Sequence, residues 1–163
     1  MSNPSSSGFT LTTSTGQKVT IKETSSTAYE KGTTPASASA VFSGETALVL
    51  GTTDSTTITA TEVILQPPSD GSNSTQVVPF APGASSTSKT VGQIPSSYNQ
   101  GSGTIVSGTT ANQATEAALA AYPGGIVDRV VQLSNGQYEV HNIGVNWPHH
   151  IFVSTDFKVV GAD

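Results

Sequence analysis

The sequence predicts a mainly β protein with a smaller α+β part, and three observations carry this prediction. Apolar and polar residues alternate in the first third of the chain, as they do in half-buried strands. A segment rich in proline, serine and glycine follows. After it come one alanine-rich helical segment and further strand patterns. We therefore expect a small antiparallel β-barrel or sandwich, then one helix packed on an antiparallel sheet.

Residues 9–66 are expected to form the β-barrel or sandwich. Residues 9–13 and 18–22 alternate on either side of a turn, which predicts a hairpin. Residues 47–51 and 56–65 predict two further strands, the second rich in β-branched residues. Short strands of this kind close into a barrel or sandwich because exposed edges need covering. The apolar face of the hairpin comprises Phe9, Leu11, Val19 and Ile21.

Residues 67–104 are predicted to form a linker, and residues 1–8 a disordered N-terminus. The linker holds five of the nine prolines and only two charged residues. Neither helical nor strand periodicity is sustained in it. Two small apolar islands, residues 77–80 and 91–94, are candidates to dock onto either domain, which would order part of the linker.

Residues 105–163 are predicted to form the α+β domain. Alanines recur near helical spacing in residues 111–122, after an N-cap at Thr109 or Thr110. Residues 123–125, Pro-Gly-Gly, end this helix. The expected strands are residues 126–133, 137–143, 149–153 and 157–160.

Composition and charge exclude several classes of function. The 163 residues carry a net charge of -5 with only six Lys and Arg, too few for the positive surface that nucleic acid or an anionic membrane needs. The chain has no cysteine, so disulfides, thiol chemistry and zinc–thiolate sites are excluded. No apolar run approaches the ~18–20 residues of a transmembrane helix.

Localisation is predicted from the low charge and from the 47 Ser and Thr residues. This combination is more typical of exported bacterial proteins than of cytosolic enzymes. The first eight residues have neither the basic nor the apolar region of a signal peptide. We therefore expect an extracytoplasmic protein, secreted or membrane-anchored, whose targeting segment is absent from this chain; a cytosolic protein is the alternative.

A family resemblance covers roughly the last third of the chain. It is carried by residues 106–111, 117–125, 127–130, 138–141 and 156–159, where a helix, a Pro-Gly stop, a strand, a turn and a Tyr-Glu-x-His motif follow in order. This order resembles a PepSY domain of exported actinobacterial proteins. PepSY domains are associated with the pro-regions of secreted peptidases, as folding aids or inhibitors, and with exported proteins of unknown role. The resemblance implies a binding or regulatory module and no catalytic site.

The first zone of the chain more loosely resembles small exported Thr-rich β-barrel domains of unknown function. In the C-terminal third, the sequence departs from the PepSY pattern at residues 144–150. Many relatives have a charged turn there, whereas this chain has Gly-Val-Asn-Trp-Pro-His-His. Any binding carried by that hairpin therefore differs in this protein.

The chain's three histidines, His141, His149 and His150, lie within ten residues. A hairpin folded about residues 145–146 places His141 opposite His150, close enough to share a metal with Glu139 as a third ligand. His149 and His150 are adjacent and point to opposite faces of a strand. We favour structural or surface roles, so no metal and no cofactor are predicted; a shared metal is the alternative.

The predicted binding residues are Trp147, His149 and His150, in the loop of residues 144–150. Trp147 offers an aromatic anchor, and the two imidazoles gain charge near pH 6.5. In the competing interpretation Trp147 packs over the open end of the sheet and only stabilises the fold.

No catalytic residues are predicted. The chain has no Gly-x-Ser-x-Gly motif, and its histidines lie in a predicted sheet without a recognisable Ser partner. Asp128 and Glu139 fall on adjacent strands, and with Arg129 they are interpreted as a surface ion network.

The sequence predicts a non-enzymatic interaction module that binds a protein or peptide, such as a secreted peptidase, and no nucleic acid. The alternative is a structural pair of cell-envelope domains that contact polysaccharide or peptidoglycan. A hydrolase is the third interpretation, and the oligomeric state is not predicted.

Overall fold

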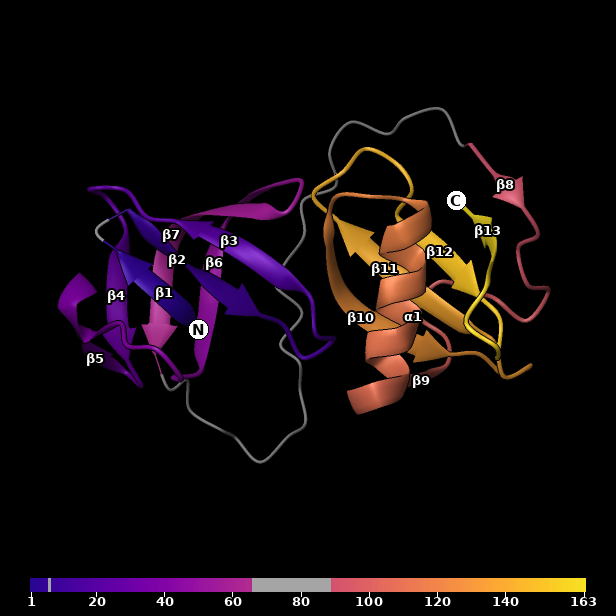
Figure 1. Ribbon diagram of the computed structural model, residues 1–163, viewed down its shortest axis with the longest axis horizontal. Coiled ribbons are helices and arrows are strands. Elements are labelled where there is room, and N and C mark those ends of the chain that lie inside the picture. Colours follow the sequence, from indigo (N-terminus) through magenta and orange to yellow (C-terminus); the bar gives the residue numbers. More distant parts are fainter. Residues whose placement is uncertain (6, 66–88) are drawn as a thin grey trace. The chain divides into compact units, whose positions relative to one another are not determined.

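The computed structural model describes residues 1–5, 7–65 and 89–163, which fall into two units (Figure 1). The first unit contains residues 1–12 and 18–65 of this described part, and the second contains residues 13–17 and 89–163. Strands dominate both units, and one α-helix is present in the described part, in the second unit. The predicted class, mainly β with an α+β part, is confirmed.

The first unit is a curled sheet built around the long strand β7 (Thr57–Leu65). β6 (Ala47–Asp54) pairs with β7 along its length in antiparallel fashion. β3 (Lys18–Lys22) and β4 (Ala28–Lys31) pair with successive halves of β7, and both pairs are parallel. The predicted all-antiparallel arrangement is wrong here, because the chain continues along β7 after β3 and does not turn back.

The predicted hairpin is present, and its predicted apolar residues pair across the two strands. β2 (Gly8–Thr12) pairs with β3 so that Phe9 lies opposite Ile21, and Leu11 opposite Val19. Phe9, Val19 and Ile21 are buried, so this face belongs to the core of the unit. Two shorter strands and one turn of 3-10 helix complete the unit: β1 (Ser2–Ser5), β5 (Thr34–Pro35) and η1 (Ala38–Ala40).

The expected disorder of residues 1–8 is wrong in the described part of that segment. Ser2–Ser5 forms β1, which pairs with β2 so that Ser2 lies opposite Thr10. The strand carries no apolar alternation, because it lies at an edge of the sheet and is held by backbone pairing. Backbone pairing of this kind leaves no periodic signal in the sequence.

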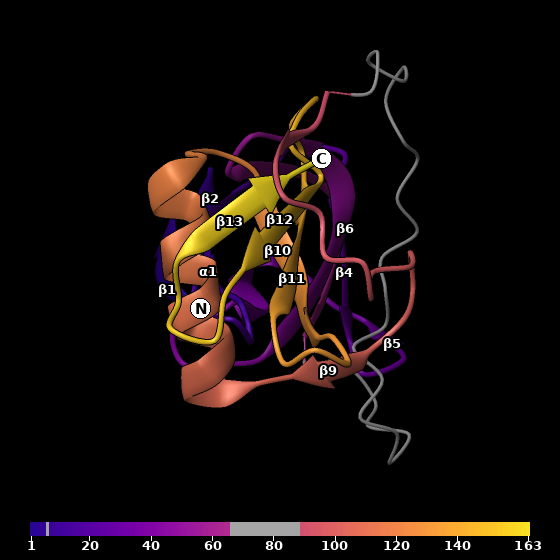
Figure 2. The same ribbon diagram turned by 90° about the vertical axis from the view of Figure 1, so that its right-hand side faces the viewer.

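The second unit is a six-stranded antiparallel sheet with α1 (Gly108–Ala121) on one face (Figure 2). The helix begins three residues earlier than predicted, after Ser107. No helix in the described ranges is long and apolar enough to cross a membrane. The strands, in their order across the sheet, are β8 (Val91–Gly92), β13 (Val159–Ala162), β12 (His150–Val153), β11 (Tyr138–Ile143), β10 (Ile126–Gln132) and β9 (Thr104–Val106).

The core of the second unit lies between α1 and the sheet. The helix contributes alanines, whose small side chains let the helix lie close to the strands. β-Branched side chains of the three central strands form the other side. The fully buried members are Ala111, Ala114, Ala118, Val130, Val140, Ile151 and Val153.

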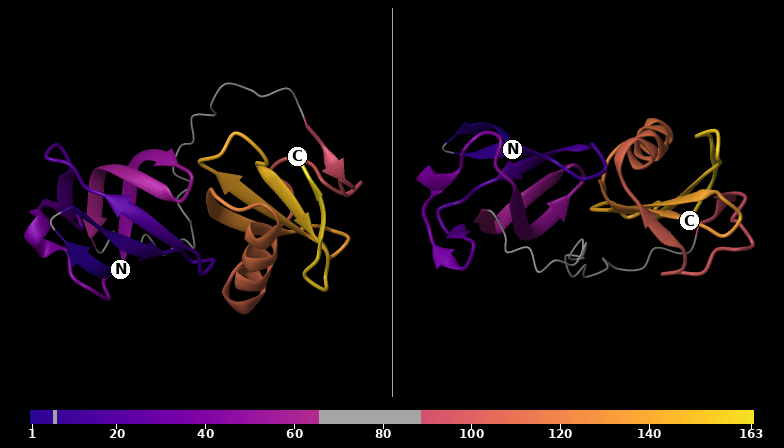
Figure 3. Two further views of the ribbon diagram at one scale, coloured as in Figure 1. Left: turned by 45° about the horizontal axis from the view of Figure 1, so that its top comes forward. Right: turned by 90° about the horizontal axis from the view of Figure 1, so that it is seen from below.

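The described part of the predicted linker belongs to the second unit. β8 pairs with β13, and β9 pairs with β10, so the strands that end the sheet both come from this region or its border. The segment between them lies on the face of the sheet opposite α1 (Figure 3). There the Tyr98 ring packs edge-on against the Phe152 ring, with the ring centroids 4.8 Å apart. The island at residues 91–94 therefore docks, as anticipated; the island at residues 77–80 lies outside the described residues.

Candidate functional site

A β-bulge in β10 positions two charged side chains on the face opposite α1. Val127 pairs with Asn142 and Arg129 pairs with His141, so Asp128 is an extra residue without a cross-strand partner. Asp128 Oδ1 lies 2.6 Å from His141 Nδ1, and its other oxygen lies 3.2 Å from Arg129 Nη1. Of the predicted surface ion network, the Asp128–Arg129 pair is present and His141 joins it. Glu139, the other predicted member, is buried and pairs with His150 instead.

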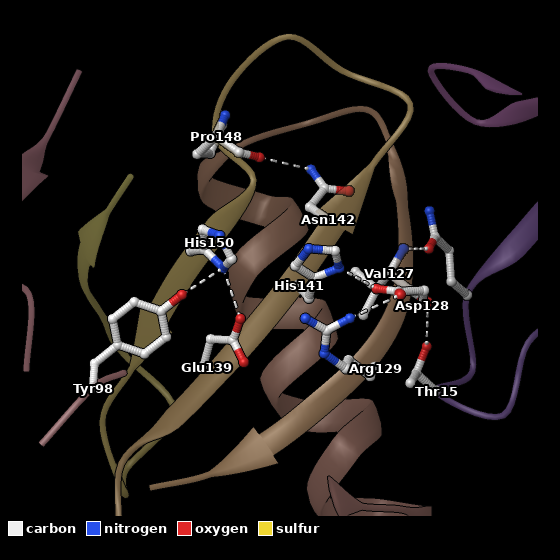
Figure 4. A network of polar contacts seen from close by, with 11 residues as sticks. Thr15, Tyr98, Val127, Asp128, Arg129, Glu139, His141, Asn142, Pro148 and His150 are labelled. Carbon is white, nitrogen blue, oxygen red and sulfur yellow. Dashed lines mark hydrogen bonds and ion pairs between the residues drawn. The ribbon is translucent and has the colours of Figure 1, made fainter. Parts of the chain in front are cut away.

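His141 and His150 lie directly opposite each other on β11 and β12, which confirms the predicted pairing. Their ring centroids are 5.1 Å apart. His150 Nδ1 lies 2.7 Å from Glu139 Oε1 and 3.0 Å from the Tyr98 hydroxyl (Figure 4). We call Asp128, His141, His150 and Glu139 the histidine–carboxylate row.

The row is largely shielded from water. Glu139 is 2% exposed and lies between Val131 and Phe152 in the register of the sheet. A buried carboxylate is costly unless it is hydrogen-bonded, and His150 supplies that partner. Burial is the main cause that raises the pKa of Tyr98 to about 12, and the charge of Glu139 is the second. The phenol therefore stays neutral at physiological pH.

With both carboxylates ionised, the contacts assign the hydrogen of each imidazole to one ring nitrogen. An ionised carboxylate can only accept hydrogen bonds, so Nδ1 is the donor in both His141 and His150. In a neutral ring the other nitrogen, Nε2, then has a free lone pair. Each Nε2 can accept a hydrogen bond, take up a proton or coordinate a metal.

The structure places the three predicted binding residues in different surroundings. His150 belongs to the row. The backbone N–H of the neighbouring His149 donates to the carbonyl of Asp163 at 2.9 Å, and the His149 carbonyl accepts from Asn142 N–H at 2.8 Å. Burial is the main cause that lowers the pKa of the His149 imidazole below its ordinary value.

Trp147 lies away from the row, against the end of the helix. Its Nε1 donates to the carbonyl of Lys89 at 2.5 Å, and its ring meets Tyr122 edge-on at 5.3 Å. The Lys89 ammonium lies 4.3 Å from the centre of the indole ring, a cation–π distance. Trp147 is half-buried by these contacts, and the rest of its surface is open to solvent.

Sequence reasoning missed one residue of this site and one contact. Tyr98 falls within the predicted linker, and the only sequence signal for it is that the linker contains just one other aromatic residue. The contact between Asp128 and His141 was missed because a bulge cannot be located from apolar–polar alternation. Regular alternation would have placed Asp128 and Arg129 on opposite faces.

Comparison of the chain with protein-family models, with curated proteins and with solved structures gave no match. The site is therefore interpreted from its own geometry.

Proposed function

We propose that this chain is a non-enzymatic, extracytoplasmic binding module whose C-terminal domain, PepSY-like in its sequence pattern, binds a protein or peptide and regulates a peptidase. One observation carries the proposal of polypeptide binding. Three large apolar side chains are exposed in the described part of the chain, and two of them lie on the strands that end the second sheet. They are Ile105 on β9, 53% exposed, and Val91 on β8, 42% exposed.

A strand that ends a sheet offers its outer backbone groups to another extended chain. Natural proteins usually protect such strands with charges or a covering loop. β9 instead presents an exposed isoleucine between Thr104 and Val106. Addition of a partner strand would supply backbone hydrogen bonds, while a side chain opposite Ile105 would cover its apolar surface.

β9 is the better of the two edges for this role. It has three residues against two in β8, and its apolar side chain is the more exposed. Ile105 also continues a line across the sheet, opposite Val131, which in turn lies opposite Glu139. A peptide with an apolar residue beside Ile105 would extend this line by one strand.

The peptidase target and the extracytoplasmic location rest on the sequence. The PepSY resemblance supports the first, because such domains are associated with pro-regions of secreted peptidases. The low charge and high Ser and Thr content support the second.

The test is inhibition of secreted peptidases by the purified full chain. Residual activity of a subtilisin-type and a thermolysin-type peptidase is measured on a chromogenic peptide, while gel electrophoresis checks that the chain stays intact. We expect inhibition by the wild type, and at least tenfold weaker inhibition by Ile105→Asp, since a charge at this position opposes burial of the strand edge. Val91→Asp, on the opposite edge, is the matched control and should inhibit like the wild type.

Two outcomes would contradict the proposal. Ile105→Asp with wild-type inhibition would exclude β9 as the binding edge. Failure to inhibit either peptidase would remove the regulatory role.

A structural role in the cell envelope is the second candidate, favoured by exposed threonines on the first unit. Thr52 of β6 lies opposite Thr59 of β7, and Thr61 follows two residues later; all three are exposed. Hydroxyl rows of this kind can hydrogen-bond to polysaccharide. Binding to isolated peptidoglycan without inhibition of peptidases would favour this function.

A further inference from the structure

We propose that His141 and His150 bind a divalent transition-metal ion between their Nε2 atoms. The two rings come from neighbouring strands and face the same side of the sheet (Figure 4). The inference is independent of the proposed peptide partner, because every group it uses belongs to the histidine–carboxylate row.

The ring separation fits a shared metal ion. A zinc–nitrogen bond of about 2.0 Å, followed by about 1.1 Å from nitrogen to ring centre, places the two ring centres about 5 Å apart at a tetrahedral angle. The observed separation of the His141 and His150 centroids is 5.1 Å, with the rings inclined at 53°. Small rotations about the side-chain torsions are then enough to aim both lone pairs at one point.

The hydrogen bonds of the row are those that support a metal-binding imidazole. A histidine ligand typically donates its other ring N–H to a carboxylate, which fixes the tautomer and increases the basicity of the ligating nitrogen. Asp128 plays this role for His141 at 2.6 Å, and Glu139 plays it for His150 at 2.7 Å. Two such carboxylate–histidine pairs side by side prepare two Nε2 donors at once.

The charge of the surroundings also favours a cation. The row carries two carboxylates, and Arg129 is the cation paired with Asp128. Glu139 is 2% exposed, so its charge acts at short range with little screening by water.

The row itself supplies only two ligands. In the described ranges no group of three His, Cys, Asp or Glu side chains is arranged to hold a metal ion. The Asp128 and Glu139 carboxylates already accept hydrogen bonds from Nδ1 of His141 and His150, so water completes the coordination. Imidazole nitrogen selects Cu²⁺, Ni²⁺ or Zn²⁺ over the oxygen-preferring Mg²⁺ and Ca²⁺.

The test is calorimetric titration of the untagged full chain with Cu²⁺, Ni²⁺ and Zn²⁺. We expect one ion per chain, with Cu²⁺ bound more tightly than Ni²⁺ or Zn²⁺. His141→Ala and His150→Ala should each weaken binding by at least tenfold. His149→Ala removes a neighbouring imidazole that couples electrostatically with both rings but contacts neither supporting carboxylate in the row. It should weaken binding much less than either of the other two substitutions.

The supporting carboxylates give a second, graded readout. Asp128→Asn and Glu139→Gln keep the shape of the site and should weaken binding by roughly 10- to 100-fold, as loss of such partners does elsewhere. Histidine side-chain NMR of the wild type with Zn²⁺ should show coordination at Nε2 of both rings, with hydrogen retained at Nδ1. This measurement needs no variant, so it decides the question even if a substitution prevents folding.

Three results would overturn the inference. One is no uptake of any of the three metals by the folded wild type. Another is equal weakening by His149→Ala and His150→Ala, and the last is zinc at Nδ1 of either ring.

Discussion

The side chain of Asn142 occupies the space that a Cβ atom on Gly125 would need: a Cβ at Gly125 would lie 2.2 Å from Asn142 Oδ1. Asn142 is 1% exposed, and its Nδ2 donates to the carbonyls of Gly124 at 3.3 Å and Pro148 at 3.5 Å. One buried amide thus joins the end of the helix to the loop that carries Trp147. Gly125 itself has φ +83°, a conformation that favours glycine.

Gly125→Ala should therefore destabilise the second unit by about 3 kcal/mol, from left-handed strain together with the collision at Asn142. Gly101→Ala is the control, because Gly101 has φ +80° but open space around it. Its cost should be about 1 kcal/mol, from conformation alone. Urea denaturation measures both losses. Equal losses in the two variants would show that the Asn142 contact does not constrain this position.

Tyr98 should stabilise the second unit mainly through its ring. Tyr98→Phe removes the hydroxyl near His150 but keeps the edge-on contact with Phe152, so we expect a loss of about 1 kcal/mol. Tyr98→Ala removes both and should cost about 3 kcal/mol. Thermal unfolding followed by circular dichroism gives the comparison. If Tyr98→Phe cost as much as Tyr98→Ala, the hydroxyl would be the dominant contribution.

Trp147→Ala tests whether the loop stabilises the fold or recognises a partner. Because the indole is half-buried and contacts Tyr122 and Lys89, its removal should cost about 2 kcal/mol. Tryptophan emission of the wild type should be only partly quenched by iodide, since Trp147 is the sole tryptophan. A melting temperature unchanged by the substitution, together with lost peptidase inhibition, would assign the residue to recognition alone.

Tyr29 makes the first unit sensitive to alkaline pH. Burial is the main cause that raises the pKa of its phenol to about 12, and the neighbouring Glu23 carboxylate is the second. The unfolded chain loses this proton near pH 10, so the stability contributed by the neutral phenol is complete below pH 10 and is lost as pH rises toward about 12. Stability measured across this window should fall less in Tyr29→Phe than in the wild type.

Glu23→Gln is the companion variant for that prediction. It removes the second cause and leaves burial, so absorbance titration at 295 nm should show the Tyr29 pKa moving only part of the way toward 10. A return to the ordinary value would make the carboxylate, and not burial, the dominant cause.

The parts of the fold that could be predicted are those fixed by local pattern. Alternation and turn residues constrain a hairpin, so the shared face of Phe9 and Ile21 and the pairing of His141 with His150 follow from the sequence. The alanine-rich helix was predicted for the same reason, although its start was placed three residues late.

The parts that could not be predicted depend on long-range pairing. Strands of two or three residues, such as β8 and β9, are too short to show a period, and their partners lie far away in sequence. The parallel pairs of β7 depend on the path that the chain takes between β3 and β4, and the residue pattern of that segment does not indicate the path. The position of Tyr98 could not be predicted for the same reason, since it is set by the pairing of the strands that flank its segment.

Because Asp128 is the extra residue of a bulge, the carboxylate that contacts His141 can be lost while the fold is kept. Val127 and Val130 both pack in the core beneath α1, although three positions apart in a strand would normally face opposite sides. Removing Asp128 would restore regular alternation, with both valines still inward and Arg129 still outward. A single codon, inserted or deleted, therefore adds or removes this carboxylate without repacking the interior, and evolution can change the chemistry of this face at little cost to the domain beneath it.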